Sequence, residues 1–256
     1  MTPRVSWISC TPVKATMLHH LDEVELLESG PKNDRRFYMI TERGRLVSNK
    51  DYGPVQLVRA DYDEATDTLA MRFPDGTVVE GPVERGEEVT TTFHGRPRPA
   101  RLVHGPWADA VSELMGQPVR LVEPPTTGPD RGRGGAATIL ASASLGRLAA
   151  QLGADDVDHR RFRMNFGIEG VDAHAEDAWR GRRVRMGEAV VIPQGHVGRC
   201  VITTQNPDTG LTDLDTLKAL AAYRGDLDTT EPLALGIHAA VAEPGRVRVG
   251  DGVELL

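Results

Sequence analysis

Gly198-Arg-Cys-Val-Ile-Thr-Thr-Gln-Asn-Pro-Asp-Thr-Gly210 is the most informative stretch of the sequence. An apolar, β-branched run over residues 197–204 leads into Asn-Pro-Asp-Thr-Gly, which predicts a tight turn. Cys200 lies in the run beside Arg199. A cysteine in such a run is usually inert packing, but a neighbouring cation favours the thiolate, and sites are often built where strands meet loops. From these residues alone, both interpretations of Cys200 stay open.

On the N-terminal side of this stretch, the first hundred residues contain many short apolar runs typical of strands. The runs cover residues 5–10, 24–27, 37–41, 46–48, 55–60, 68–73 and 77–79. Asp75-Gly76 separates the last two and predicts a hairpin, because both residues tolerate positive φ. Many short strands at near-regular spacing indicate a barrel or sandwich.

Helical spacing of apolar residues occurs in three places, residues 109–115, 142–152 and 213–223. Strands are expected at residues 119–122, 162–166, 184–186, 189–192 and around 247–255. Residues 123–135 are rich in Pro and Gly and are interpreted as a linker or an active-site loop. We therefore expect a mainly β chain with a few helices (α+β), divided into modules of residues 1–123 and 124–256.

Composition excludes several classes of protein. The formal net charge of −7 over 256 residues argues against a nucleic-acid partner. Cys10 and Cys200 are the only cysteines, too few for a disulfide scaffold or a four-cysteine metal site. No signal peptide is recognisable, and no run approaches the roughly 18 apolar residues that span a bilayer. We expect a cytoplasmic protein without a membrane partner.

The stretch around Cys200 resembles the signature of MOSC domains, especially that of the mitochondrial amidoxime-reducing component and its bacterial relatives. Further segments resemble the same family in the same order along the chain. They are Thr11-Pro-Val-Lys14, Asn33-Asp-Arg-Arg-Phe37, Arg161-Phe-Arg-Met-Asn-Phe166, Ala175-Glu-Asp-Ala-Trp179, Val184-Arg-Met-Gly187 and the C-terminal Glu243-Pro-Gly-Arg-Val-Arg-Val-Gly-Asp-Gly-Val-Glu-Leu-Leu256. The resemblance therefore covers essentially the whole chain. It implies a MOSC N-terminal β-barrel-like module followed by a MOSC β-barrel domain.

For the site, the resemblance implies a molybdenum–pterin cofactor (molybdopterin) with Cys200 as the thiolate ligand to the metal and the catalytic centre. Thiolates suit a metal already held by sulfur. Arg163 and Asn165 match cofactor-binding positions, and as alternating residues of one strand they are expected to share a face. Lys14 and Arg36 match the cationic positions that hold the phosphate end of the cofactor.

Two positions depart from the family pattern. Ala15 replaces a usual Ser, and Gly134-Gly135 falls where a Thr-Ser pair is usual, so side-chain hydroxyl donors are missing. The backbone N–H groups of a glycine loop can also bind an anion, and our hypothesis is that Arg131 or Arg133 adds positive charge there. The way the cofactor is held is therefore the open part of the prediction.

The reaction implied is the two-electron reduction of an N-oxygenated small molecule, such as an N-hydroxylated amidine. Electrons would come from a separate donor protein of flavin, haem or iron–sulfur type. Two alternatives stay open: a sulfur carrier or sulfurtransferase that uses a persulfide on Cys200, and a non-catalytic carrier of the cofactor.

Overall fold

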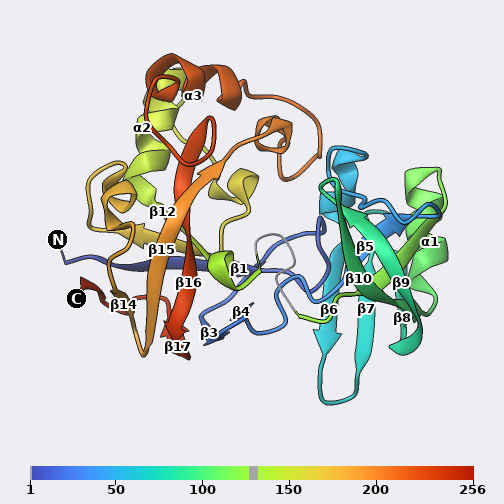
Figure 1. Ribbon diagram of the computed structural model, residues 1–256. Coiled ribbons are helices and arrows are strands. Elements are labelled where there is room, and N and C mark those ends of the chain that lie inside the picture. Colours follow the sequence, from blue (N-terminus) through green and yellow to red (C-terminus); the bar gives the residue numbers. More distant parts are fainter. Residues whose placement is uncertain (1, 127–131) are drawn as a thin grey trace.

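The computed structural model describes residues 2–126 and 132–256 and confirms a mainly β chain with a few helices (Figure 1). Its largest sheet has eight strands and is curled. In spatial order they are β18 (Val253–Leu255), β14 (Val184–Met186), β15 (Ala189–Gly198), β16 (Ala234–Glu243), β12 (Ala137–Ala141), β13 (Phe166–Glu169), β1 (Arg4–Cys10) and β2 (His19–His20). The N-terminal strand β1 pairs antiparallel with β13. Residues from both ends of the chain thus build one sheet.

The second module, on the right of Figure 1, consists of two smaller sheets and a helix. One sheet contains β5 (Tyr38–Thr41), β11 (Val119–Glu123), β10 (Arg96–His104) and β9 (Glu84–Phe93), in that order. The other contains β6 (Arg59–Asp63), β7 (Thr68–Arg72) and β8 (Val78–Pro82). Helix α1 (Trp107–Met115) is fixed by the fully buried Trp107, whose indole Nε1 donates to the Leu69 carbonyl at 2.7 Å.

The modules interleave through the N-terminal strands. Strand β3 (Glu23–Leu27) pairs with β17 (Gly245–Arg248) on one side and β4 (Gly30–Pro31) on the other. The division near residues 123–135 stays a prediction, and β1 and β3 each pair with a strand from the C-terminal half of the chain. Residues of the segment 11–36 contact both modules: the Met17 N–H donates to the Val58 carbonyl, and Arg35 donates to the Arg163 carbonyl.

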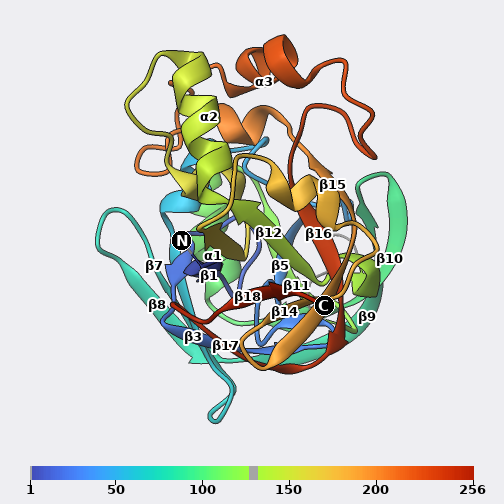
Figure 2. The same ribbon diagram turned by 90° about the vertical axis from the view of Figure 1, so that its left-hand side faces the viewer.

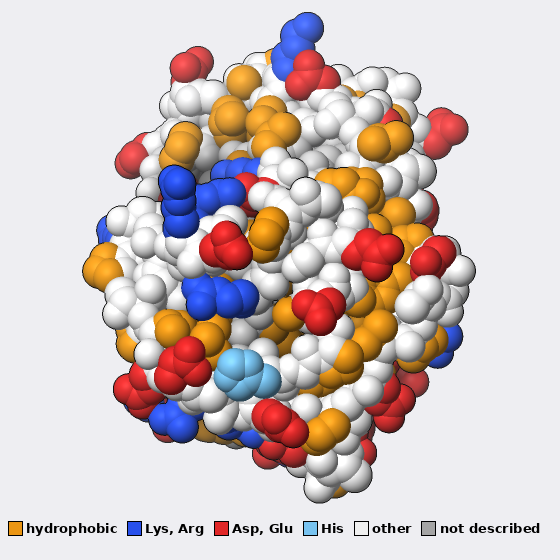
Figure 3. All heavy atoms as spheres, turned by 90° about the vertical axis from the view of Figure 1, so that its right-hand side faces the viewer, with side chains coloured by type: hydrophobic (Ala, Val, Ile, Leu, Met, Phe, Trp, Pro, Cys, Tyr) orange, Lys and Arg blue, Asp and Glu red, His pale blue; other side chains and the backbone are white. Residues whose placement is uncertain are grey.

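Helices α2 (Ser142–Leu152) and α3 (Thr216–Arg224) lie together over one end of the large sheet (Figures 1 and 2). Their apolar faces meet in a buried cluster that includes Leu145, Leu148 and Leu220. No helix in the described ranges is both long and apolar enough to cross a membrane. Over the face formed by the N-terminal module, acidic and basic side chains are interspersed (Figure 3).

The structure corrects the predicted strand at residues 162–166. Residues His159–Phe162 form a 3-10 turn, η3, because the Asp158 carboxylate accepts the Arg160 backbone N–H at 2.8 Å. Arg163 then has a φ of 53°, and β13 begins only at Phe166. Arg163 and Asn165 therefore do not alternate along one strand, and their side chains reach different surroundings.

The run over residues 197–204 is also not one strand. Strand β15 ends at Gly198, and Val201–Thr204 forms a 3-10 turn, η5, for which Cys200 is the residue just before the first turn. Strands β9, β10 and β16 were not predicted. The first two carry little apolar alternation because most of their side chains are exposed.

Candidate functional site

A pocket of about 410 Å³ lies between the two modules and contains the Cys200 side chain in its wall. Segments that are distant in sequence contribute to it. Its lining residues include Lys14, Ala15, Gly30, Asp34, Arg35, Ser48, Asn49, Lys50, His94, Gly135, Thr138, Arg163, Arg199, Cys200 and Glu231. The thiol thus shares a cavity with several cationic side chains.

Local hydrogen bonds fix the backbone at Cys200. The Cys200 carbonyl accepts the backbone N–H and the hydroxyl of Thr203, both at 3.0 Å. The Thr203 hydroxyl also lies 2.7 Å from that of Thr216, the first residue of α3. Cys200 itself is half-buried. The 3-10 turn and the helix behind it therefore hold the thiol at the pocket wall.

The turn that follows Cys200 is docked on the other module. The buried Gln205 donates from Nε2 to the Asn49 carbonyl at 2.9 Å, and Gln56 donates to the Asn206 carbonyl at 3.1 Å. A Cβ on Gly53 would overlap the Gly210 carbonyl oxygen, so this contact requires glycine. Contacts at 205–210 thus set the position of Cys200 relative to the N-terminal module.

Cationic side chains are oriented around the pocket by backbone carbonyls. Arg163 donates from Nη2 to the Thr16 carbonyl at 2.7 Å, and Arg35 donates from Nη2 to the Arg163 carbonyl at 2.8 Å. Arg199 donates to the carbonyls of Leu235 and Phe162. Carbonyl acceptors therefore orient three guanidinium groups around the pocket, and Arg35 also pairs with the Asp34 carboxylate at 2.6 Å.

Backbone strain also concentrates here. Eight non-glycine residues in the described chain have a positive φ, and four of them line the pocket: Ala15, Arg35, His94 and Arg163. Such conformations cost about 1 kcal/mol or more each and are found preferentially at functional sites. The Ala15 backbone, at a φ of 81°, is held by Asn49, whose Nδ2 donates to the Ala15 carbonyl at 2.8 Å.

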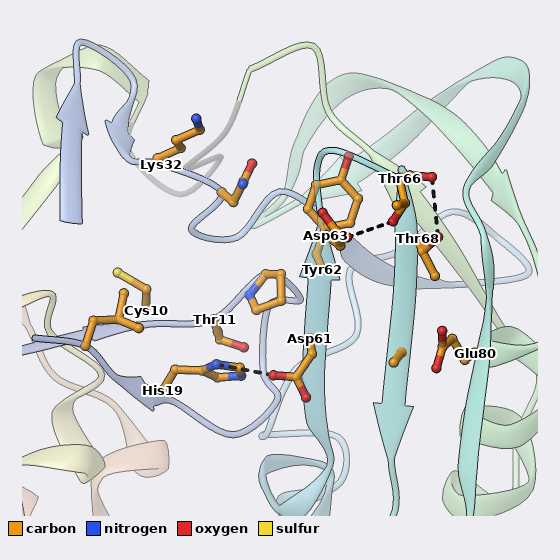
Figure 4. Close-up of a pocket in the computed structure, with 14 residues that line it drawn as sticks. Cys10, Thr11, His19, Lys32, Asp61, Tyr62, Asp63, Thr66, Thr68 and Glu80 are labelled. Atoms are coloured by element: carbon orange, nitrogen blue, oxygen red, sulfur yellow. Dashed lines mark hydrogen bonds and ion pairs between the residues drawn. The ribbon is translucent and has the colours of Figure 1, made fainter. Parts of the chain in front are cut away.

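The two thiols have different environments. Cys10 is buried, and burial together with the nearby Asp34 carboxylate raises the pKa of its thiol well above the usual value. It borders a different cavity, of about 650 Å³. In that cavity the His19 side chain points to Asp61 (Figure 4), and 3.7 Å separates His19 Nδ1 from Asp61 Oδ1. Cys200 is therefore the thiol available for chemistry in the described structure.

The donor set at Cys200 limits what the site can hold. No group of three or more His, Cys, Asp or Glu side chains with metal-ligand geometry occurs in residues 2–126 and 132–256. One thiolate with a cationic surrounding does not bind a bare metal ion tightly, but it fits a metal whose other ligands arrive with an anionic organic cofactor. The chemistry of the residues present is thus compatible with a molybdenum–pterin group.

Two family models match the sequence. The model described as MOSC domain matches residues 125–254, and the model described as MOSC N-terminal beta barrel domain matches residues 2–116. The chain belongs to the MOSC domain family.

Curated relatives of this MOSC protein include amidoxime-reducing proteins. It is similar to mitochondrial amidoxime-reducing component 1 of Xenopus laevis, with 26% identity over 97% of this chain and 81% of that protein. With the human protein of the same name, the identity is 28% over 96% of this chain and 80% of the human protein. Among solved structures, the YUAD protein from Bacillus subtilis covers 100% of this chain and 96% of its own, at 11% identity and a TM-score of 0.46.

Of the side chains that the resemblance assigned to the site of this MOSC protein, Lys14, Arg163 and Cys200 line the pocket. Arg36 does not: its guanidinium pairs with Glu123 at 3.0 Å, lies over the Tyr62 ring and borders another cavity. Arg35, one position earlier, lines the pocket instead and was missed. Consecutive residues point in different directions, and sequence alone does not decide which arginine faces inward.

Asn165 belongs to a buried network behind the pocket. Its Nδ2 donates to Asp34 Oδ2 at 2.9 Å, and its Oδ1 accepts the Thr138 hydroxyl at 2.9 Å. Asp34 in turn pairs with Arg35 at 2.6 Å. Asn165 therefore contacts the pocket through Asp34 and Arg35.

The glycine stretch at residues 132–135 reaches the pocket through Gly135, but its Arg133 does not line the pocket. Gly135 lines the pocket. Arg133 is exposed and pairs with Glu28 at 3.3 Å, outside the pocket lining. Arg131 lies outside the described residues.

Proposed function

We propose that this protein holds a molybdenum–pterin cofactor in the pocket at Cys200 and reduces N-hydroxylated compounds. The observation that carries the proposal is the half-buried Cys200 thiol in the wall of a pocket that also contains Lys14, Arg35 and Arg163. A thiolate suits a metal held by sulfur, and guanidinium groups suit a phosphate. Similarity to amidoxime-reducing proteins along nearly the whole chain supports the reaction class.

Lys14, Arg35 and Arg163 would hold the anionic part of the cofactor. We assign to Arg35 the role that the resemblance implied for Arg36, because Arg35 lines the pocket. Asn165 is a positioning residue in this scheme, since it holds Asp34, which holds Arg35. Ala15 lines the pocket but supplies no side-chain hydroxyl to the cofactor.

When bound, the cofactor supplies two-electron redox chemistry, and the protein supplies binding and orientation. Reduction of an N-hydroxylated amidine breaks its N–O bond, consumes two electrons and two protons, and releases water and the amidine. With only two cysteines, the chain cannot ligate an iron–sulfur cluster of four cysteines. We therefore assign electron delivery to a separate donor protein of flavin, haem or iron–sulfur type.

Single-turnover reduction of benzamidoxime by dithionite-reduced protein tests the proposal. The protein would be produced in a host that makes the cofactor, with Cys200→Ser and Cys10→Ser prepared in parallel. We expect product from the wild type and from Cys10→Ser, and at least a 100-fold loss, on the order of 3 kcal/mol, in Cys200→Ser. Mass spectrometry that finds a persulfide on Cys200 in protein without molybdenum would instead support the sulfur-carrier alternative. Full molybdenum loading without turnover would identify a carrier.

A further inference from the structure

Two consecutive arginines of η3, Arg160 and Arg161, connect this turn to the segment that follows η5. Arg161 donates from Nη1 to Asp213 Oδ1 at 2.6 Å and from Nη2 to Asp213 Oδ2 at 2.8 Å. Arg160 makes the same kind of two-point contact with Asp208, at 2.8 and 3.1 Å. Each arginine therefore links the two 3-10 turns that border the pocket at Cys200.

The two ion pairs differ in burial. The Arg161 and Asp213 side chains are 6% and 37% exposed, whereas those of Arg160 and Asp208 are 31% and 70% exposed. An exposed ion pair contributes little because solvent screens it and its side chains stay mobile. A guanidinium fork on a carboxylate has a defined geometry, and it holds the pKa of the Asp213 carboxyl below its usual value. The Arg161–Asp213 pair is therefore the link that fixes the distance between the turns.

This buried pair also holds the end of η5. The backbone N–H of Asp213 donates to the Thr204 carbonyl at 3.0 Å, and Arg161 Nη1 approaches the same carbonyl at 3.4 Å. Thr204 is the last residue of η5, and its hydroxyl donates to the Val201 carbonyl at 2.7 Å. Val201 directly follows Cys200. A short series of contacts thus runs from the Arg161 guanidinium group to the residue beside the thiol.

The same two turns present two groups to the pocket. Arg163 directly follows η3, and Cys200 directly precedes η5. Arg161, Arg163 and Cys200 all line the pocket. Holding η3 against η5 therefore fixes the backbone that carries the Arg163 guanidinium group relative to the backbone that carries the Cys200 thiol.

We propose that Arg161 is a positioning residue that, through Asp213, holds the Cys200 thiol in place relative to Arg163. The inference rests on the proposed function for its purpose. A cofactor that takes the thiolate at its metal and Arg163 at its anionic part binds well only when the two groups are a set distance apart. Residues that orient a metal ligand from behind commonly govern metal affinity in this way.

The test compares conservative variants of the buried pair, Arg161→Lys and Asp213→Asn, with the matched variants of the exposed pair, Arg160→Lys and Asp208→Asn. Lys keeps the charge and the aliphatic stem but cannot bind both carboxylate oxygens as a planar fork. Asn keeps the size of the aspartate side chain and removes its charge. Each substitution therefore weakens one link while changing little else.

Two readouts are measured, the rates at which iodoacetamide modifies Cys200 and Cys10 in cofactor-free protein, and the molybdenum content of protein from a cofactor-producing host. In Arg161→Lys and Asp213→Asn we expect Cys200 to react about threefold faster or more, because η5 is no longer held, with the rate at the buried Cys10 unchanged. We expect their molybdenum content to fall about tenfold. Both exposed-pair variants should match the wild type.

Equal acceleration at Cys10 and Cys200 would show that the substitutions loosen the whole fold and would overturn the inference. An unchanged Cys200 rate, wild-type molybdenum content in both buried-pair variants, or equal effects in the exposed-pair variants would also overturn it. A wild type without molybdenum would refute the proposed function, and the two alkylation rates would then decide the positioning role by themselves.

Discussion

At the residue scale, the different environments of Cys10 and Cys200 predict different thiol reactivities. Cys10 is buried with a raised thiol pKa, whereas Cys200 is half-buried at a pocket wall. Because the thiolate is the reactive form and must be accessible, iodoacetamide at pH 7.5 should modify Cys200 of cofactor-free protein at least tenfold faster than Cys10. Peptide mass spectrometry over a time course measures both rates. Comparable rates would show that the Cys10 side chain opens to solvent.

Arg35 and Arg36 are neighbours in the sequence, and comparing them tests which arginine binds the cofactor. Arg35 lines the pocket, while Arg36 pairs with Glu123 outside it. We expect Arg35→Ala to lower cofactor occupancy at least tenfold, on the order of 1.4 kcal/mol of binding, and Arg36→Ala to leave it within twofold. Molybdenum content of protein purified under identical conditions gives the answer. The reverse order would return the phosphate-binding role to Arg36.

At the element scale, the protonation of His174 affects the stability of the fold. His174 directly precedes the 3-10 turn η4 (Ala175–Trp179). Burial, with a further contribution from Arg224, lowers the pKa of His174 from 6.5 to about 4. Between these pH values the unfolded chain binds more protons than the folded one, so stability is complete above pH 6.5 and falls as the pH drops towards 4.

His174→Asn should remove part of this pH dependence. Asn suits the φ of 64° at this position and does not titrate. We expect the loss of unfolding free energy between pH 7 and pH 4.5 to be about 1–2 kcal/mol smaller in the variant, less than the full shift because the ring is partly solvated. Urea unfolding at both pH values measures it, and an identical loss in both proteins would assign the effect to other groups.

The same scale shows what local sequence predicts well. Regular apolar spacing correctly located α1 and α2, and the Asp75-Gly76 turn located the β7–β8 hairpin. It failed at residues 162–166, where the Asp158 side chain and the left-handed Arg163 override an apolar run. It also missed β9 and β10, because most of their side chains are exposed and the buried apolar ones do not alternate regularly along the strands.

At the scale of the whole molecule, the site depends on how the two modules meet. Lys14 and Cys200 were predicted from motifs, but no pattern in either motif indicates that Gln205 binds the Asn49 carbonyl or that Arg35 faces the pocket. These features depend on tertiary contacts between segments about 150 residues apart. Family resemblance supplied the residues, and the packing of the modules decides which of them converge.

Gly210→Ala tests this contact between the modules. Gly210 has a φ of 74°, and a Cβ there would lie 2.5 Å from the Pro54 nitrogen. We expect a loss of about 2–4 kcal/mol in unfolding free energy together with a lower molybdenum content. Gly76→Ala is the control: its φ is 89° with nothing within 4 Å, so it should cost only about 1–2 kcal/mol from backbone strain and leave the metal content unchanged. Equal effects of the two substitutions would mean that the module contact does not govern the site.

The most direct test of the central claim is the molybdenum-to-protein ratio of wild type, Cys200→Ser and Cys10→Ser, purified from a host that produces the cofactor and measured by inductively coupled plasma mass spectrometry. The account predicts molybdenum in the wild type and Cys10→Ser, and a loss of about 90% or more in Cys200→Ser, because an oxygen replaces the soft thiolate ligand. Equal molybdenum in the wild type and Cys200→Ser, or none in the wild type, would contradict it.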